Sequence, residues 1–245
     1  MNHKFLKWIG VSIASLLVSL CASCGTSSDD GKIDIIAAIF PEYDWVMNVV
    51  GDKKEDINVK LLLDNGVDLH SYQPSFKDIT SISKCDLFIY VGGESDEWVE
   101  DVLKDAKNKD MLTINLMDVL GDKKKEEELI EGMEGEEEEE VEYDEHVWLS
   151  LKNAKLFVNT IADAIGKLDA ENASYYKANA TSYVANLVAL DAQYTTAVAA
   201  GSKNTVVFAD RFPFRYLVDD YNLKYYAAFV GCSAEANASF KTIAF

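Results

Sequence analysis

The chain has 245 residues, of which 49% are hydrophobic, so it is long enough to bury one large core or two modest ones. Its formal net charge is −19, which argues against nucleic acid or an anionic membrane surface as a partner bound through its charge. The same charge would attract cations, although solubility alone explains it equally well.

Residues 1–23 have the pattern of a secretory signal peptide. A short basic start precedes an apolar run over residues 8–21, which is shorter than the roughly 20 residues of a membrane-spanning helix. Small residues before Cys24 resemble a bacterial lipobox, so we predict lipidation at Cys24 and a polar tether over residues 24–32. The predicted product is an exported lipoprotein on the extracytoplasmic face of a bacterial cell membrane, held by more than one acyl chain. Plain secretion and an uncleaved anchor are the alternatives.

Residues 33–125 alternate between apolar strand patterns and helical patterns. This alternation predicts an N-terminal α/β lobe with a parallel sheet covered by helices on both faces. The predicted strands are residues 33–40, 57–62, 87–91 and 112–116. The predicted helices between them are residues 43–50, 77–84 and 98–106.

The first of two histidines outside the leader, His70, lies in a loop that follows the second predicted strand. Ligand sites in parallel sheets usually lie beyond the carboxyl ends of the strands. Imidazole is the commonest protein ligand for zinc and related ions, which it binds as the neutral base. His70 is therefore a candidate metal ligand, with a surface or capping histidine as the simpler alternative.

Residues 126–145 hold thirteen acidic residues and no basic one. A block of like charges repels itself, so we predict an acidic mobile loop. It is either a solvated linker or a lid that collects cations without supplying a ligand to the metal. The segment ends directly on His146, the second candidate metal ligand.

Residues 146–198 predict two helices separated by a break, with Asp169 as the N-cap of the second. The second helix, residues 170–198, is about 40 Å long and can cross a whole domain. Residues 199–245 read as the start of a C-terminal α/β lobe, with strands at residues 205–209 and 225–230. Two strands cannot bury a core of their own, so we expect this lobe to be incomplete.

Two cysteines, Cys85 and Cys232, lie outside the leader and are far apart in sequence. They form no CxxC motif. A disulfide is compatible with an exported protein, and two buried free thiols are the simpler interpretation. The sequence leaves this choice open.

The motifs together resemble the metal-binding receptors of ABC transporters, in the zinc and manganese group whose two lobes are joined by one long helix. The matching motifs are residues 51–52, 66–75, 86–93, 97–98, 145–149 and 176–180. The resemblance implies an α/β fold of two lobes, each with a parallel sheet flanked by helices. It also implies that His70 and His146 bind the metal and that an ABC permease is the partner. We expect a monomer with no catalytic residues.

The chain departs from the family at the third ligand. Just after the first strand of the second lobe, zinc-type members of the family have a histidine and manganese-type members have a glutamate. No histidine stands there in this chain. Asp210 is the nearest carboxylate, although Arg211 could pair with it. Glu235 is a weaker candidate for the fourth ligand.

Three function classes follow from these residues. We predict a solute-binding lipoprotein that captures a divalent transition metal and delivers it to an ABC importer, with zinc favoured over manganese because imidazole suits zinc. A surface adhesin is the alternative. A zinc hydrolase would need two histidines, a carboxylate and an open water position, but the chain has neither HExxH nor GxSxG.

Overall fold

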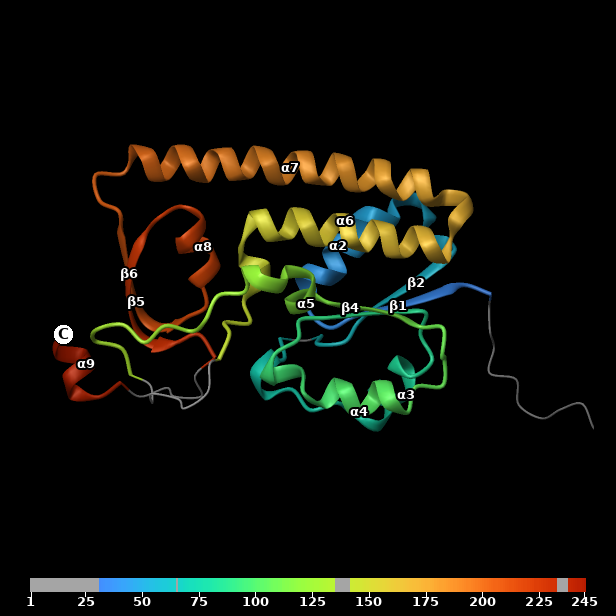
Figure 1. Cartoon of the computed structure of the whole chain (residues 1–245), viewed down its shortest axis with the longest axis horizontal. Coiled ribbons are helices and arrows are strands. Elements are labelled where there is room, and N and C mark those ends of the chain that lie inside the picture. The colour runs from blue at the N-terminus through green and yellow to red at the C-terminus, as the bar shows by residue number, and fades with distance from the viewer. Residues whose placement is uncertain (1–30, 65, 135–141, 233–237) are drawn as a thin grey trace, which may run out of the picture. The chain divides into compact units, whose positions relative to one another are not determined.

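Four parallel strands form the central sheet of the first lobe (Figure 1). The computed structural model describes residues 31–64, 66–134, 142–232 and 238–245. Of these, Ile33–Phe245 belong to one compact unit. The strands are β1 (Ile33–Ala37), β2 (Ile57–Leu61), β3 (Leu87–Tyr90) and β4 (Leu112–Asn115). Their order is β2-β1-β3-β4, which confirms the predicted parallel sheet.

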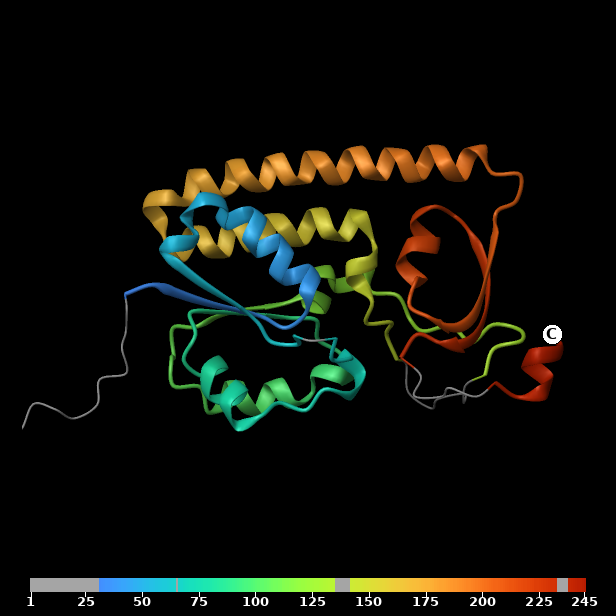
Figure 2. The same ribbon diagram turned by 180° about the vertical axis from the view of Figure 1, so that it is seen from behind.

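Helices cover both faces of this sheet (Figures 1 and 2). One face carries α2 (Phe40–Val50) and α6 (Leu151–Leu168), and α7 (Ala173–Ala200) runs alongside α6 on the side away from the sheet. The other face carries α3 (Phe76–Ile82) and α4 (Trp98–Lys104). Short 3-10 turns are η2 (Gly51–Glu55), η3 (Leu69–Ser71), η4 (Glu94–Asp96), η5 (Gly121–Lys123), η6 (Val147–Leu149) and η7 (Ala170–Asn172).

The core of the first lobe continues from the sheet into the two long helices. Phe88 of β3, Phe157 of α6 and Tyr176 of α7 are all fully buried. The rings of Trp45 and Phe157 lie 5.6 Å apart and join α2 to α6. The apolar residues at helical spacing in α6 therefore form the buried face that the sequence predicts.

The first helix begins earlier than predicted. Residues 38–40 were expected to extend the first strand, but α2 starts at Phe40 with Pro41 in its first turn. Proline suits this position because the first helical N–H groups have no partner within the helix. The carboxyl group of Glu42 accepts from the N–H groups of Ala38 and Ile39 at 2.8 and 3.2 Å. These bonds end the strand and begin the helix.

Two short helices were not predicted. In α5 (Leu116–Leu120), the Asn115 side chain accepts from the N–H of Asp118 at 3.1 Å, so β4 ends one residue before the predicted limit. The second, α8 (Arg215–Asp220), begins directly after Phe214 without a side-chain cap. Both are too short to show a helical period in the sequence.

The long helix α7 contacts both lobes, as predicted. Its 28 residues span about 42 Å and contain no glycine or proline. Towards its start, Asn179 donates to the carbonyl of Val49 in α2 at 2.9 Å. Towards its end, Asp191 accepts from the hydroxyl of Tyr221 at 2.9 Å, just beyond α8. Asp169 caps η7 instead of α7 and also accepts from Tyr176 at 2.6 Å.

The second lobe has a small sheet of two parallel strands, β5 (Thr205–Phe212) and β6 (Lys224–Val230). Its core is centred on Phe212, Val218 and Ala227, with Tyr225 stacked on Phe212 at 3.9 Å between ring centroids. Val207 of β5 is 74% exposed, so the sheet is covered only in part. The last helix is α9 (Phe240–Ala244).

The acidic segment is ordered at both of its described ends. The N–H of Glu127 donates to the carbonyl of Glu142 at 2.9 Å, and that of Glu134 donates to Ala228 in β6 at 2.8 Å. Its last two residues are buried, so they do not belong to a solvated loop. Residues 135–141 and the leader with Cys24 lie outside the described residues. None of the described helices is long and apolar enough to cross a membrane.

Candidate metal centre

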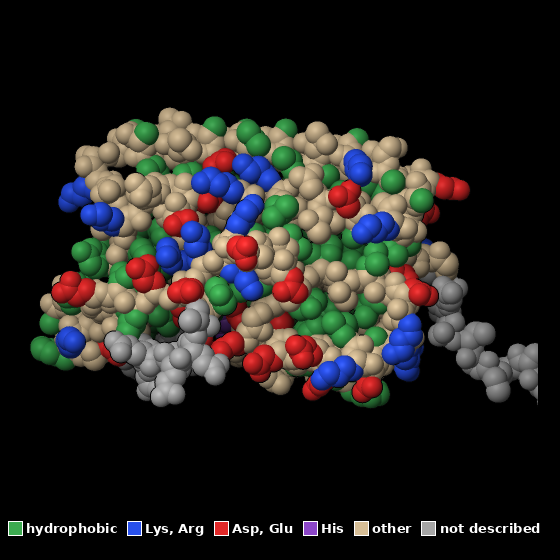
Figure 3. Space-filling view, in the orientation of Figure 1, with side chains coloured by type: hydrophobic (Ala, Val, Ile, Leu, Met, Phe, Trp, Pro, Cys, Tyr) green, Lys and Arg blue, Asp and Glu red, His purple; other side chains and the backbone are tan. Residues whose placement is uncertain are grey.

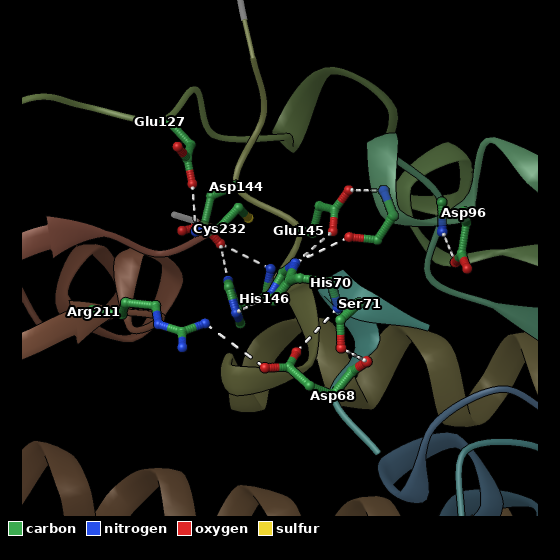
Figure 4. Close-up of polar contacts among 12 residues, drawn as sticks. Asp68, His70, Ser71, Asp96, Glu127, Asp144, Glu145, His146, Arg211 and Cys232 are labelled. Atoms are coloured by element: carbon green, nitrogen blue, oxygen red, sulfur yellow. Dashed lines mark hydrogen bonds and ion pairs between the residues drawn. The ribbon is translucent and has the colours of Figure 1, made fainter. Parts of the chain in front are cut away.

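Two imidazole rings meet where the two lobes adjoin (Figure 4). The Nε2 atoms of His70 and His146 lie 3.2 Å apart. His70 lies in η3, which follows β2 after a loop, and His146 immediately precedes η6. The structure therefore brings together the two histidines that the sequence singles out, although 76 positions separate them.

His70 is held by groups from three segments. The Asp68 carboxylate accepts from the backbone N–H of His70 at 3.0 Å and caps the turn. The Nδ1 atom of His70 lies 3.0 Å from the Ser95 hydroxyl and 3.5 Å from the Glu145 carboxylate. Glu145 also accepts from the N–H of Ser95 at 2.9 Å. The ring thus has a fixed orientation, with its Nε2 atom directed at His146.

The contact between His70 and Glu145 changes the pKa of both groups. The hydrogen bond to Glu145 raises the pKa of His70, although burial works in the opposite direction. Burial would raise the pKa of Glu145, but hydrogen bonds from His70 and Ser95 outweigh it and lower that pKa. Glu145 is consequently an ionised, buried acceptor that orients the imidazole.

A glycine makes room for this buried carboxylate. Gly93 has a φ of +82°, and a Cβ atom there would collide with the Glu145 side chain. Glycine adopts this backbone conformation without the strain that other residues incur. The turn that carries Ser95 can therefore lie directly against Glu145.

His146 is held in a parallel manner by Asp144. The Asp144 carboxylate lies 3.2 Å from the Nδ1 atom of His146 and accepts from its backbone N–H at 2.8 Å. The Asp144 carbonyl accepts in turn from the Tyr216 hydroxyl of α8 at 2.9 Å. Asp144 and His146 are 2% and 6% exposed, so the second lobe packs over this side of the pair.

The arrangement fits a bound transition-metal ion. Each ring has its Nδ1 beside a buried carboxylate, as metal-binding histidines usually do, and both Nε2 atoms face one point. Two nitrogens bound to tetrahedral zinc at about 2.0–2.1 Å are about 3.3 Å apart. The observed 3.2 Å separation matches this distance.

Comparison with known proteins agrees with this chemistry. Residues 35–245 match the family model described as zinc-uptake complex component A periplasmic, ZnuA. The chain belongs to the ZnuA family.

Two relatives and one solved structure illustrate the similarity. The zinc-binding lipoprotein AdcA of Streptococcus pneumoniae is 33% identical over 236 residues, which cover 96% of this chain and 46% of AdcA. The high-affinity zinc uptake system protein ZnuA of Bacillus subtilis is 30% identical over 90% of this chain and 70% of its own length. The crystal structure of the Zn(II)-bound ZnuA-like domain of S. pneumoniae AdcA superposes with a TM-score of 0.67 at 30% identity, covering 87% and 73% of the two chains. The chain thus spans about half the length of AdcA.

Of the other predicted ligands of this ZnuA-family chain, Asp210 is not brought into the histidine cluster. Asp210 lines the same pocket as His70 and His146, a cavity of about 770 Å³, but it does not belong to their cluster. Its carboxylate accepts from the N–H of Arg211 at 2.8 Å, whereas the Arg211 guanidinium lies 3.7 Å from Asp68. The suspected ion pair between Asp210 and Arg211 is therefore replaced by one with Asp68. Glu235 lies outside the described residues.

A group that the sequence analysis did not select joins the pair instead. The Cys232 sulfur and the ligand nitrogens of His70 and His146 all lie within 4.8 Å of one another. In the described part of the chain, Cys85 and Cys232 are free thiols, and only Cys85 is fully buried. The position of Cys232 was a usable signal, because it follows the carboxyl end of β6 as His70 follows β2.

A second cavity of about 430 Å³ borders the cluster on the side of His70 and Cys232. Its wall includes five glutamates, which are Glu94, Glu97, Glu127, Glu142 and Glu145. Figure 3 shows acidic side chains on this face around the small histidine surface that is visible there. A cation entering the cavity would meet negative charge before it reaches the imidazoles.

Proposed function

We propose that this chain captures a zinc ion between His70 and His146 and delivers it to the membrane permease of an ABC importer. The observation that carries the proposal is the pair of Nε2 atoms 3.2 Å apart, each ring oriented by a buried carboxylate. At this separation both Nε2 atoms can bind the same metal ion. Without a metal, a single hydrogen bond is all that can join them.

Zinc is the favoured ion because imidazole suits zinc, whereas carboxylate sets suit manganese. The nearest carboxylates, Asp144 and Glu145, face the Nδ1 atoms. They orient the rings and do not bind the ion. The names of the relatives support this choice, since they describe zinc-binding and zinc-uptake proteins. Manganese is the alternative ion, and direct competition between the two metals decides between them.

The site favours binding over catalysis. A hydrolytic zinc site needs a base that activates the metal-bound water. Each of the two buried carboxylates beside the rings accepts a backbone N–H and lies 3.2 or 3.5 Å from an imidazole Nδ1 atom. We therefore propose a receptor, monomeric in solution, that binds the metal ion and releases it unchanged.

The delivery step requires a place next to a membrane transporter. We propose that lipid attachment at Cys24 supplies it, on the extracytoplasmic side, with the permease as the protein partner. The family description, zinc-uptake complex component A, supports a partner within an uptake complex. Mass measurement of the membrane-associated protein, before and after release by a lipase, tests the acylation directly.

The site assignment is tested by calorimetric zinc titration of the chain without its leader and of two variants. His70→Ala removes one imidazole ligand, and we expect zinc affinity to fall by more than about 100-fold, since loss of an orienting partner alone costs 10–100-fold. Ser71→Ala is the matched control, because this neighbouring side chain is exposed and bonds only the Asp68 carbonyl at 3.4 Å. Equal affinity of His70→Ala and the wild type would disprove the assignment.

A further inference from the structure

The carboxyl end of β6 brings a sulfur atom to the histidine pair. Cys232 stands two residues beyond Val230, the last residue of the strand. Its Sγ atom and the two imidazole ligand atoms lie within 4.8 Å of one another, and Figure 4 shows its side chain beside the two rings. We infer that Cys232 is the third protein ligand of the captured ion, so that two imidazoles and one thiolate hold it. The inference rests on the proposed function, because it takes His70 and His146 as ligands.

The backbone at this position is held against the pair from two sides. A Cβ atom on Gly231 would lie 2.9 Å from the Phe212 carbonyl and 3.1 Å from the His146 ring. Only glycine allows the chain to pass this close without displacing the imidazole. On the other side, the N–H of Cys232 donates to the Glu127 carboxylate at 3.2 Å. The direction of the following side chain is therefore constrained by the same contacts that pack His146.

The distances leave room for one tetrahedral ion. Zinc bonds to sulfur at about 2.3 Å and to nitrogen at about 2.0–2.1 Å, so adjacent ligand atoms are about 3.3–3.6 Å apart. The nitrogen pair already has this separation at 3.2 Å. The sulfur lies within 4.8 Å of both nitrogens, so any approach that it needs is at most little more than about 1 Å, which a side-chain adjustment at one cysteine can supply.

The other candidates for a third ligand are engaged elsewhere or lie further away. Asp210 does not belong to the cluster, and the Arg211 side chain pairs with Asp68. Glu145 and Asp144 face the Nδ1 atoms. Among the described histidines, cysteines and acidic residues, only Cys232 joins the two rings in a group close enough to share an ion.

A thiolate ligand would change the selectivity of the site between zinc and manganese. Soft sulfur ligands favour zinc, whereas carboxylates suit manganese. When the ion binds, the sulfur–metal bond forms as the S–H bond breaks, and the proton leaves to solvent. His70 and Cys232 both border the acid-lined cavity. A water molecule or a carboxylate from that cavity would complete a tetrahedral set of four ligands.

The decisive measurement is X-ray absorption spectroscopy of the zinc-loaded chain without its leader. We expect one sulfur neighbour at about 2.3 Å together with nitrogen neighbours at about 2.0–2.1 Å. Cobalt(II) substitution gives a second signature, an intense thiolate-to-cobalt charge-transfer absorption. Both signals should persist in Cys85→Ala, the matched control, because that thiol is 1% exposed in the first lobe and bonds Ile82.

Cys232→Ser tests the same ligand by substitution and keeps the size of the side chain. We expect both sulfur signals to disappear and zinc affinity to fall at least about 10-fold. Cys232→Asp should bind zinc more weakly and manganese more strongly relative to zinc than the wild type does. Since the spectra are recorded on the wild type, a variant that folds poorly does not decide the outcome.

The results separate this inference from the proposed function. Tight zinc binding with only nitrogen and oxygen neighbours, lost in His70→Ala, would overturn the cysteine ligand and leave the receptor intact. A loss of affinity in Cys232→Ser without a sulfur signal in the wild type would assign the residue a packing role and also overturn the inference. A wild-type chain that binds no zinc would overturn both.

Discussion

The two lobes differ greatly in the structural support that they give to the proposed metal site. The first lobe carries the proposed ligand His70 on a turn that is anchored to a four-stranded sheet with a large core. The second lobe sets Cys232 at the end of a two-stranded sheet whose core is centred on three buried residues. The segment that carries His146 joins them, with its ring on Asp144 and its backbone leading into α6.

This difference indicates which part of the site is preorganised. Buried carboxylates hold the rings of both His70 and His146 in orientations that suit an ion. The Cys232 sulfur lies within 4.8 Å of the ring nitrogens but is carried by the lobe with the smaller core. Local stability varies across a structure, and an element with few buried contacts opens at lower cost than a large core. We expect metal binding to order the second lobe against the first.

Removing one core ring from each lobe is the strongest test of this contrast. Phe157→Ala empties a fully buried site in the first lobe, and we expect the free energy of unfolding to fall by about 3–5 kcal/mol. Phe212→Ala in the second lobe should speed amide exchange in β5 and β6 with little effect on β1 to β4. Urea denaturation and hydrogen exchange measure the two effects. A single cooperative loss of protection in both variants would show that the lobes unfold as one.

Glu145→Gln probes the preorganised side directly. The amide keeps the size of the side chain but removes the charge that orients His70, so we expect zinc affinity to fall by about 10–100-fold. Glu94→Gln is the matched control, because that exposed glutamate lines the same cavity without bonding the ring. Isothermal titration at physiological salt measures both. Equal zinc affinity of Glu145→Gln and the wild type would mean that Ser95 alone orients the imidazole of His70.

Glu42 should make the first lobe sensitive to pH. It is completely buried, and burial raises its pKa to about 8 from an ordinary 4.5. The folded chain keeps a proton that the unfolded chain loses, so Glu42 lowers stability as the pH rises from 4.5 to 8. Glu42→Gln should leave stability nearly unchanged at pH 4.5 and increase it by about 1–3 kcal/mol at pH 8. Exposed Glu55→Gln is the control, and urea denaturation at the two pH values is the measurement.

The ion pair between Asp68 and Arg211 connects the two lobes and should have the smallest effect. The nitrogen–oxygen distance is 3.7 Å, and both side chains are more than a third exposed. Exposed pairs contribute about 0–1 kcal/mol, so Arg211→Gln should change the free energy of unfolding by less than about 1 kcal/mol. Thermal unfolding at low and high salt checks this. A larger loss would show that the pair fixes the lobes relative to each other.

Local pattern was enough to predict most of the first lobe. Alternating apolar strands and amphipathic helices have periods that are visible in the sequence, so β1 to β4, α6 and α7 were predicted to within a few residues. Both histidines were found because they are scarce and lie in turns. The short helices α5 and α8 escaped, since five or six residues are too few to show a period.

The other groups of the proposed site depend on contacts between segments far apart in the chain. Asp144 and Glu145 look like the end of a solvated acidic run, yet each is 2% exposed beside an imidazole. Asp210 is the carboxylate nearest to the family position in sequence, but the side chain that reaches the rings is Cys232.

The sequence by itself determined the parallel first lobe, the long connecting helix and the two imidazoles, because these follow from periodicity and residue type. Only the tertiary structure decided which acids orient the rings and which third group approaches them. The physical reason is that burial and the distance between two atoms are properties of packed segments, and no spacing along the chain encodes them.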